Sequence, residues 1–182
     1  GLAPAQVAEL LVARKKEHFW DPDYLGIAVD ALKKGHRPSG LLKGARFVSL
    51  LREFLPVQTF EELKVPLLIP TTNLTTQSPH LITSGEIATA IHATCAYLGL
   101  FQAVRWEGEL HWDGGIVDKA PALALHDFAG EKLDALLVHY LPSRDGVTEP
   151  RGAFAYASGL ASGMAAIRKD HFRLQLEVLK AR

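Results

Sequence analysis

Hydrophobic residues recur along this chain at two different spacings, and together they predict an alternation of helices and short strands. Apolar residues three and four positions apart predict helices, the clearest of which covers 41–55 and ends at Pro56. Continuous apolar runs at 65–72 and 134–141 have strand length and are typical of strands buried on both faces of a parallel sheet. Helices that alternate with such strands predict a layered α/β domain.

Capping and turn signals predict the remaining elements. Thr83-Ser84-Gly85-Glu86 has the spacing of a capping box, which predicts that a helix begins there. Alternation over 103–113 predicts a hairpin that turns at Glu107-Gly108. Further helices are expected over 4–19, 24–32 and 119–128, and a last helix carries Ile167, Leu174 and Val178 on one face.

Composition limits the class of protein. The 182 residues are 48% hydrophobic, and 20 Lys and Arg residues balance 20 Asp and Glu residues. The balanced charge leaves no basic field, so we expect no nucleic-acid partner. A single cysteine, Cys95, excludes an internal disulfide or a cysteine-based zinc site and indicates a reducing compartment, so a cytoplasmic protein is expected. No apolar run approaches the roughly 20 residues that would cross a bilayer.

Candidate nucleophiles and metal ligands give few signals. A nucleophile elbow places glycine two residues before and two residues after the serine, and no serine has both; Ser158 and Ser162 only precede a glycine. Cys95 falls within an expected apolar helix, which is more typical of a packed core thiol than of a nucleophile. The histidines do not cluster at metal-ligand spacing, and His126-Asp127 is by itself a weak sign of a metal phosphohydrolase. We therefore expect neither a metal nor a cofactor.

An acid followed by two glycines is the most informative short motif. Asp113 ends the expected hairpin, and Gly114 and Gly115 lead directly into a helix-like run. Glycines permit a tight turn at a strand end, where α/β folds keep catalytic groups beside a cleft. The alternative is an Asp-Gly turn that closes a hairpin, and the tripeptide alone favours that alternative. The segments before Asp113 reverse the preference.

Four segments in a fixed order closely resemble the bacterial patatin-like phospholipases. They are GLLKG at 40–44, TFEELKVPL at 59–67, AIHATCAYLGLF at 90–101 and WDGGIVDKAP at 112–121. The resemblance extends over 1–141, whereas 142–182 carry no family signature. It implies a three-layer α/β/α sandwich with a mainly parallel central sheet, and it implies hydrolysis of lipid acyl esters by a serine–aspartate dyad.

The resemblance assigns roles to the Asp-Gly-Gly motif. Asp113 would be the general base, supported by Gly114 and Gly115, because a carboxylate within hydrogen-bond reach can activate a serine hydroxyl. In relatives the oxyanion loop and the nucleophile precede the segment that resembles Gly1-Leu2-Ala3-Pro4. Residues 1–182 are therefore expected to form a single incomplete patatin-like domain without the first strand and the elbow. We expect the isolated chain, which lacks the nucleophile, to be inactive.

Two functions stay open at this point: a lipid acyl hydrolase, or a catalytically inactive relative that acts as a binding protein. The expected partners are a lipid or another acyl ester, a membrane surface contacted peripherally, and a second copy of the chain. Self-association is expected because a missing first strand would leave a sheet edge unpaired. The apolar stretch 98–101 is either core or a lip that contacts the acyl chain, and burial in the core is the favoured interpretation.

Overall fold

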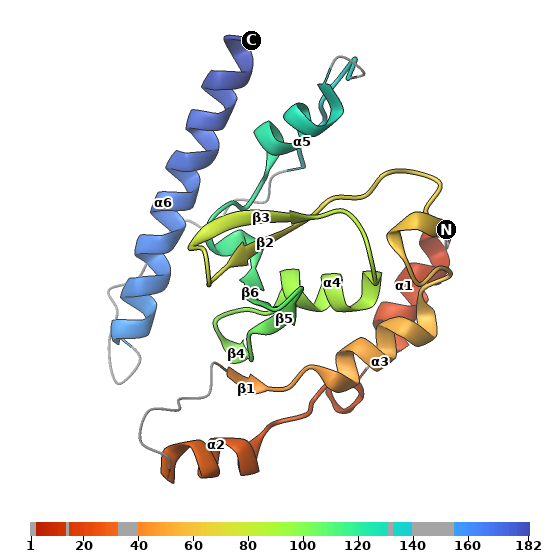
Figure 1. Ribbon diagram of the computed structural model, residues 1–182, viewed down its shortest axis with the longest axis vertical. Helices are drawn as coiled ribbons and strands as arrows, with labels where there is room; N and C mark the ends of the chain where they lie inside the picture. Colours follow the sequence, from red (N-terminus) through yellow and green to blue (C-terminus); the bar gives the residue numbers. More distant parts are fainter. Residues whose placement is uncertain (1–2, 14, 33–39, 131–132, 140–154) are drawn as a thin grey trace. The chain divides into compact units, whose positions relative to one another are not determined.

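The protein is represented by a computed structural model that describes residues 3–13, 15–32, 40–130, 133–139 and 155–182. They belong to two compact units, Gly1–Gly114 and Gly115–Arg182 (Figure 1). The first unit contains the helices α1 (Pro4–Ala13), α2 (Tyr24–Leu32), α3 (Ala45–Phe54) and α4 (Ile87–Cys95). The second contains α5 (Ala122–Ala129) and α6 (Ala155–Lys180). Short 3-10 turns occur at Lys16–His18, Phe60–Glu62 and Gly114–Ile116.

The first unit holds two sheets. In the smaller, β1 (Gly40–Leu42) pairs in parallel with β4 (Gly99–Phe101). The larger has the order β3-β2-β6-β5 and is antiparallel throughout. Its strands are β2 (Ile69–Asn73), β3 (Ser78–Ile82), β5 (Val104–Trp106) and β6 (Glu109–Asp113). The α/β class is confirmed, but the run at 65–72 lies in an antiparallel sheet, because a short turn joins β2 directly to its neighbour β3.

Helix α4 covers one face of the four-stranded sheet and supplies the centre of the core. It packs against β2, β5 and β6 (Figure 1). Ile69 and Ile82, which are opposite each other in the β2–β3 register, are buried with Ala90 and Ala93 of α4. Small side chains on this face let the helix lie close to the sheet. The close packing brings the C-terminal end of α4 to the end of β6.

Long-range contacts explain three departures from the expected elements. The helix expected at 41–55 begins only at Ala45, because residues 40–42 pair with β4. The strand expected from Val65 begins at Ile69, and the Val65 side chain is exposed. The run expected to form a strand at 134–141 has no strand over 133–139, while 140 and 141 lie outside the described residues. A strand needs a hydrogen-bonded neighbour, and no described strand pairs with 133–139.

The capping box expected at Thr83–Glu86 is also wrong. Glu86 precedes α4 without a side-chain cap bond, and its carboxylate accepts hydrogen bonds from Arg52 at 2.5 and 3.0 Å. A capping box occurs instead at Thr59, where Glu62 accepts from the Thr59 backbone N–H at 3.0 Å. By contrast, the hairpin is confirmed, with positive φ values of 49° at Glu107 and 88° at Gly108.

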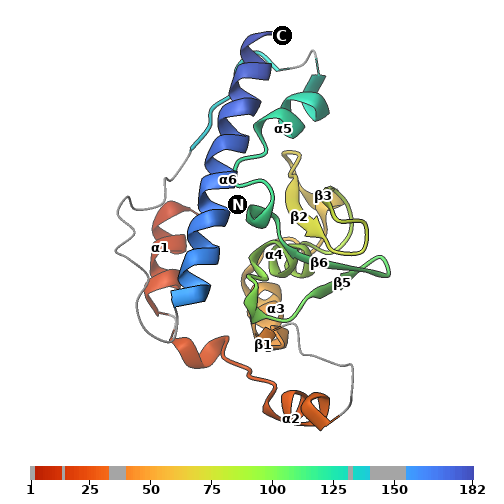
Figure 2. The same ribbon diagram turned by 90° about the vertical axis from the view of Figure 1, so that its left-hand side faces the viewer.

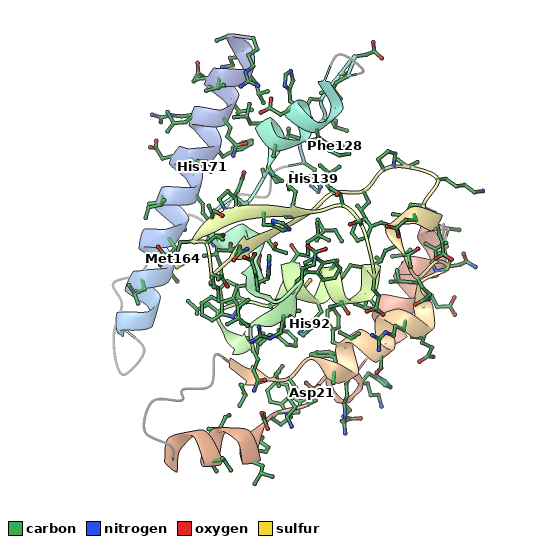
Figure 3. The ribbon with its side chains drawn as sticks, viewed as in Figure 1. Asp21, His92, Phe128, His139, Met164 and His171 are labelled. Atoms are coloured by element: carbon green, nitrogen blue, oxygen red, sulfur yellow. The ribbon has the colours of Figure 1, made fainter. Side chains whose placement is uncertain are left out.

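A buried histidine faces the start of α3. The His92 side chain on α4 is buried, and its Nε2 has no hydrogen-bond partner among the described residues. It packs against Gly44, which has a φ of 81° and leaves no room there for a Cβ. Asp21 accepts hydrogen bonds from the backbone N–H groups of Gly44 and Arg46 at 3.0 and 3.1 Å. Figure 3 shows how Asp21 and His92 lie. Burial lowers the pKa of His92, while the charge of Asp21 opposes that shift.

A buried glutamine links the helices of the second unit. Helices α5 and α6 pack against each other (Figure 2), and the Gln175 side chain of α6 is buried. Its Oε1 accepts from the Leu123 backbone N–H at 3.0 Å, and its Nε2 donates to Asp118 at 3.0 Å. Leu174, expected on the apolar face of α6, is exposed. None of the described helices is long and apolar enough to span a membrane.

Candidate active site

Asp113 is the last residue of β6, which is one of the two inner strands of the four-stranded sheet. It is half-buried and stands opposite Thr71 of β2 in the strand register. Because side chains alternate between the two faces of a sheet, Asp113 shares a face with His111 and Thr71. This is the face whose apolar residues pack against α4. The aspartate that is expected to be the general base therefore lies at a strand end beside a helix.

Hydrogen bonds from two directions hold the main chain at Asp113. Its backbone N–H donates to the carbonyl oxygen of Ala96, the residue after α4, at 3.1 Å. Its own carbonyl oxygen accepts from the Thr72 hydroxyl at 2.8 Å. Nearby, the Thr94 hydroxyl donates to the carbonyl oxygen of Pro70 at 2.5 Å, which joins α4 to β2. The residue at the end of β6 is thus fixed to both the helix and the neighbouring strand.

The two glycines after Asp113 form a 3-10 turn and do not close a hairpin. Gly114 and Gly115 are not among the glycines with positive φ, so left-handed geometry is not the reason for glycine there. At Gly114 the reason is close approach: a Cβ would lie 2.6 Å from the carbonyl carbon of Pro70 and closer still to its oxygen. The carbonyl oxygen of Gly115 accepts a hydrogen bond from Arg168 at 2.9 Å.

Cys95 ends α4, next to the residue that binds Asp113. The expectation of a packed core thiol is wrong, because Cys95 is exposed. Neighbouring protein atoms that desolvate the thiol raise the pKa of Cys95, and the negative charge of Asp113 raises it further. Since the thiolate is the nucleophilic form, both effects make Cys95 a poor nucleophile. The same interaction shows that the Asp113 carboxylate lies near the C-terminal end of α4.

A row of buried polar residues continues from Asp113 along its face of the sheet, and the sequence patterns did not single it out. The His111 side chain is only 1% exposed, and its Nδ1 lies 2.9 Å from the Thr71 hydroxyl oxygen. The rings of His80 and His111 meet edge to face with centroids 5.1 Å apart. Burial, with His80 adding to it, lowers the pKa of His111 and so favours the neutral ring. His111 lies two residues before Asp113 on the same strand, and this spacing was the signal that could have placed both side chains on one face of the sheet.

The segment from the end of α4 through β4 presents apolar side chains to solvent. Leu98 is 44% exposed and Leu100 is 41% exposed, whereas Phe101 is buried. The favoured assignment of 98–101 to the core is therefore correct for Phe101 and wrong for both leucines. Leu98 follows Ala96 by two residues, so this apolar lip, defined as Leu98 and Leu100, is close along the chain to the residue that binds Asp113.

Other candidate groups do not join the site. Ser84 lies between β3 and α4, the strand-to-helix setting of an elbow, but it precedes the N-terminal end of α4. A nine-residue helix is about 13 Å long, which separates Ser84 from an acid beside the other end of α4. The His126 Nδ1 lies 3.3 Å from an Asp127 oxygen, and Asp127 also binds Arg182 on the surface of the second unit. No group of three metal-ligating side chains gathers among the described residues.

The fold and the position of the acid define an α/β protein with a candidate hydrolytic site at a strand end. The family model for patatin-like phospholipase matches residues 1–126, and the chain belongs to this family. The matched range includes the whole first unit and the motif from Asp113 to Gly115. Family membership implies lipid acyl hydrolase activity and lipid substrates. It confirms, over residues 1–126, the resemblance to the patatin-like phospholipases drawn from the four ordered segments.

Proposed function

We propose that the protein is a lipid acyl hydrolase in which Asp113 is the general base of a serine–aspartate dyad. The observation that carries the proposal is the fixed position of Asp113 at the end of β6, within the part of the chain that matches the family. A half-buried carboxylate in that position can accept the proton of a serine hydroxyl as the oxygen attacks an ester carbonyl. The alcohol then leaves with a proton, and water releases the fatty acid from the acyl-enzyme.

The proposal includes the origin of the serine. Ser84 is separated from Asp113 by the length of α4, and the raised pKa of Cys95 argues against a thiol substitute. We propose that this sequence contributes the aspartate half of the dyad and that the 182-residue chain alone is inactive. Gly114 and Gly115 support the position of Asp113, and no cofactor or metal takes part. The exposed lip of Leu98 and Leu100 favours an apolar acyl group as substrate.

Ester hydrolysis by the natural full-length protein tests this function. We expect release of p-nitrophenol from a short-chain p-nitrophenyl ester, and loss of about a hundredfold or more in kcat on Asp113→Asn, since a general base contributes that much. Asp134→Asn is the matched control, because Asp134 is exposed and lies in a loop. The 182-residue chain should not exceed the blank. Full activity after Asp113→Asn would refute the role of Asp113.

The alternative is a catalytically inactive relative that binds lipids or a protein partner. The same assay distinguishes the two, because a full-length protein without activity toward esters of several chain lengths would favour the binding role. Peripheral membrane contact and a cytoplasmic location belong to the proposal. Sedimentation with phospholipid vesicles measures the membrane contact, and fractionation of cells measures the location. Self-association is measured by light scattering.

A further inference from the structure

The peptide at Asp113 lacks a regular strand neighbour on one side. The ladder between β5 and β6 reaches only the Val104–His111 pair. Beyond it, the N–H of Asp113 donates to the carbonyl oxygen of Ala96 at 3.1 Å, and its carbonyl oxygen accepts from the Thr72 hydroxyl at 2.8 Å. A loop carbonyl and a side-chain hydroxyl thus satisfy the two backbone groups at the position of the acid.

Thr72 acts on the main chain of Asp113 from the other side of the sheet. It pairs with Trp112 in the β2–β6 register, so its side chain points to the face opposite the Asp113 side chain. Thr72 is 6% exposed, and valine would fill the same space with an equal preference for strands. Packing alone therefore does not require a hydroxyl. What valine would lose is the donor for the Asp113 carbonyl oxygen.

We propose that Thr72 is a positioning residue, whose hydroxyl fixes the peptide after Asp113 and thereby directs the Asp113 carboxylate toward the C-terminal end of α4. The proposal rests on the proposed function of Asp113 as the base. The direction of the side chain depends on the backbone that carries it, and a base must reach hydrogen-bond distance of the hydroxyl that it deprotonates. Thr94, which binds Pro70 at 2.5 Å beside Gly114, completes the attachment of this segment to α4.

Cys95 provides a reporter for the carboxylate that does not depend on catalysis. It is the single cysteine in the chain, it is exposed, and the charge of Asp113 contributes to its raised pKa. The rate of alkylation by iodoacetamide at a fixed pH follows the thiolate population. We expect Asp113→Asn to speed alkylation about two- to fivefold, because the interaction of two unit charges in water is worth about 1 kcal/mol at about 4 Å and less at a longer distance.

A double-mutant cycle on the 182-residue chain tests the positioning role. We expect the effect of Asp113→Asn on the alkylation rate to fall to less than half in a Thr72→Val background and to stay complete in Thr72→Ser. Thr76→Val is the matched control, because Thr76 is exposed and its hydroxyl oxygen lies 2.8 Å from that of Ser78. A full Asp113→Asn effect in Thr72→Val would overturn the proposal. No effect in the wild-type background would overturn it as well, since the carboxylate would then not face Cys95.

Hydrogen exchange of backbone amides covers the case in which Thr72→Val is too unstable for alkylation. Thr72→Ser and Thr72→Ala are then compared. If Thr72 positions Asp113, the Asp113 amide exchanges faster in Thr72→Ala relative to the His111 amide, and Thr72→Ser restores it. An equal acceleration of exchange at the Asp113 and His111 amides would overturn the proposal, because Thr72 would then stabilise the whole strand and not the position of Asp113. None of these measurements involves an ester, so their failure is distinct from failure of the hydrolase proposal.

Discussion

Replacement of Gly114 by alanine directly tests the steric basis of the Asp-Gly-Gly motif. A Cβ on Gly114 would lie 2.6 Å from the carbonyl carbon and 3.0 Å from the Cβ of Pro70. Carbon atoms in van der Waals contact are about 3.5–4.0 Å apart, so one of the two chains has to move by roughly 1 Å. Pro70 lies in β2, which is paired on both sides, and cannot yield alone. Overpacking of this kind costs about 1–3 kcal/mol, and two backbones in contact place the cost near the upper value.

The measurement is urea unfolding followed by tryptophan fluorescence. Trp20, Trp106 and Trp112 are the three tryptophans of the chain, and all lie in the first unit, so the signal reports on the unit that contains Gly114. We expect Gly114→Ala to lower the free energy of unfolding by about 2–3 kcal/mol, after the gain of less than about 1 kcal/mol from a stiffer unfolded chain.

A second glycine separates steric from conformational effects. Gly108 has a φ of 88° with no atom near a Cβ, so Gly108→Ala meets conformational strain alone. That strain costs about 1–2 kcal/mol. We therefore expect Gly114→Ala to lower the free energy of unfolding more than Gly108→Ala does, because only Gly114 contacts Pro70. A loss below about 0.5 kcal/mol in Gly114→Ala would refute the close-approach explanation.

Two further predictions concern buried polar side chains. Burial lowers the pKa of His92, so its unfolded form binds protons more readily, and the free energy of unfolding should fall as the pH drops below about 6.5. His92→Gln should reduce this pH dependence in urea titrations, and an unchanged slope between pH 7 and 5 would contradict the assignment. In the second unit, Gln175→Leu removes partners from Leu123 and Asp118, and we expect a loss of about 2 kcal/mol, measured by circular dichroism. Gln6→Leu on the exposed face of α1 serves as its control, and an equal effect would show that burial of Gln175 is unimportant.

Local signals in the sequence determined the elements that depend on neighbours a few residues away. The hairpin turn at Glu107-Gly108 was predictable because glycine, with a preceding polar residue, readily takes positive φ. The bounds of α2, Tyr24–Leu32, followed from the Asp21-Pro22-Asp23 break and the terminal lysines. Asp113 was proposed as the candidate base because four ordered segments resemble one family. The match over 1–126 confirms the family, and the role of Asp113 stays a prediction.

Tertiary structure alone decided the features that depend on residues far apart in the chain. The antiparallel pairing of β2, the exposure of Leu98 and the absence of a strand at 133–139 follow from which surfaces meet, and periodicity carries no record of that. The same holds at the site. Thr72 is 41 residues from Asp113, and no local pattern connects its hydroxyl with the Asp113 carbonyl. The sequence by itself identified Asp113 as the candidate base, and the packing of β2, β6 and α4 decided where this residue is held.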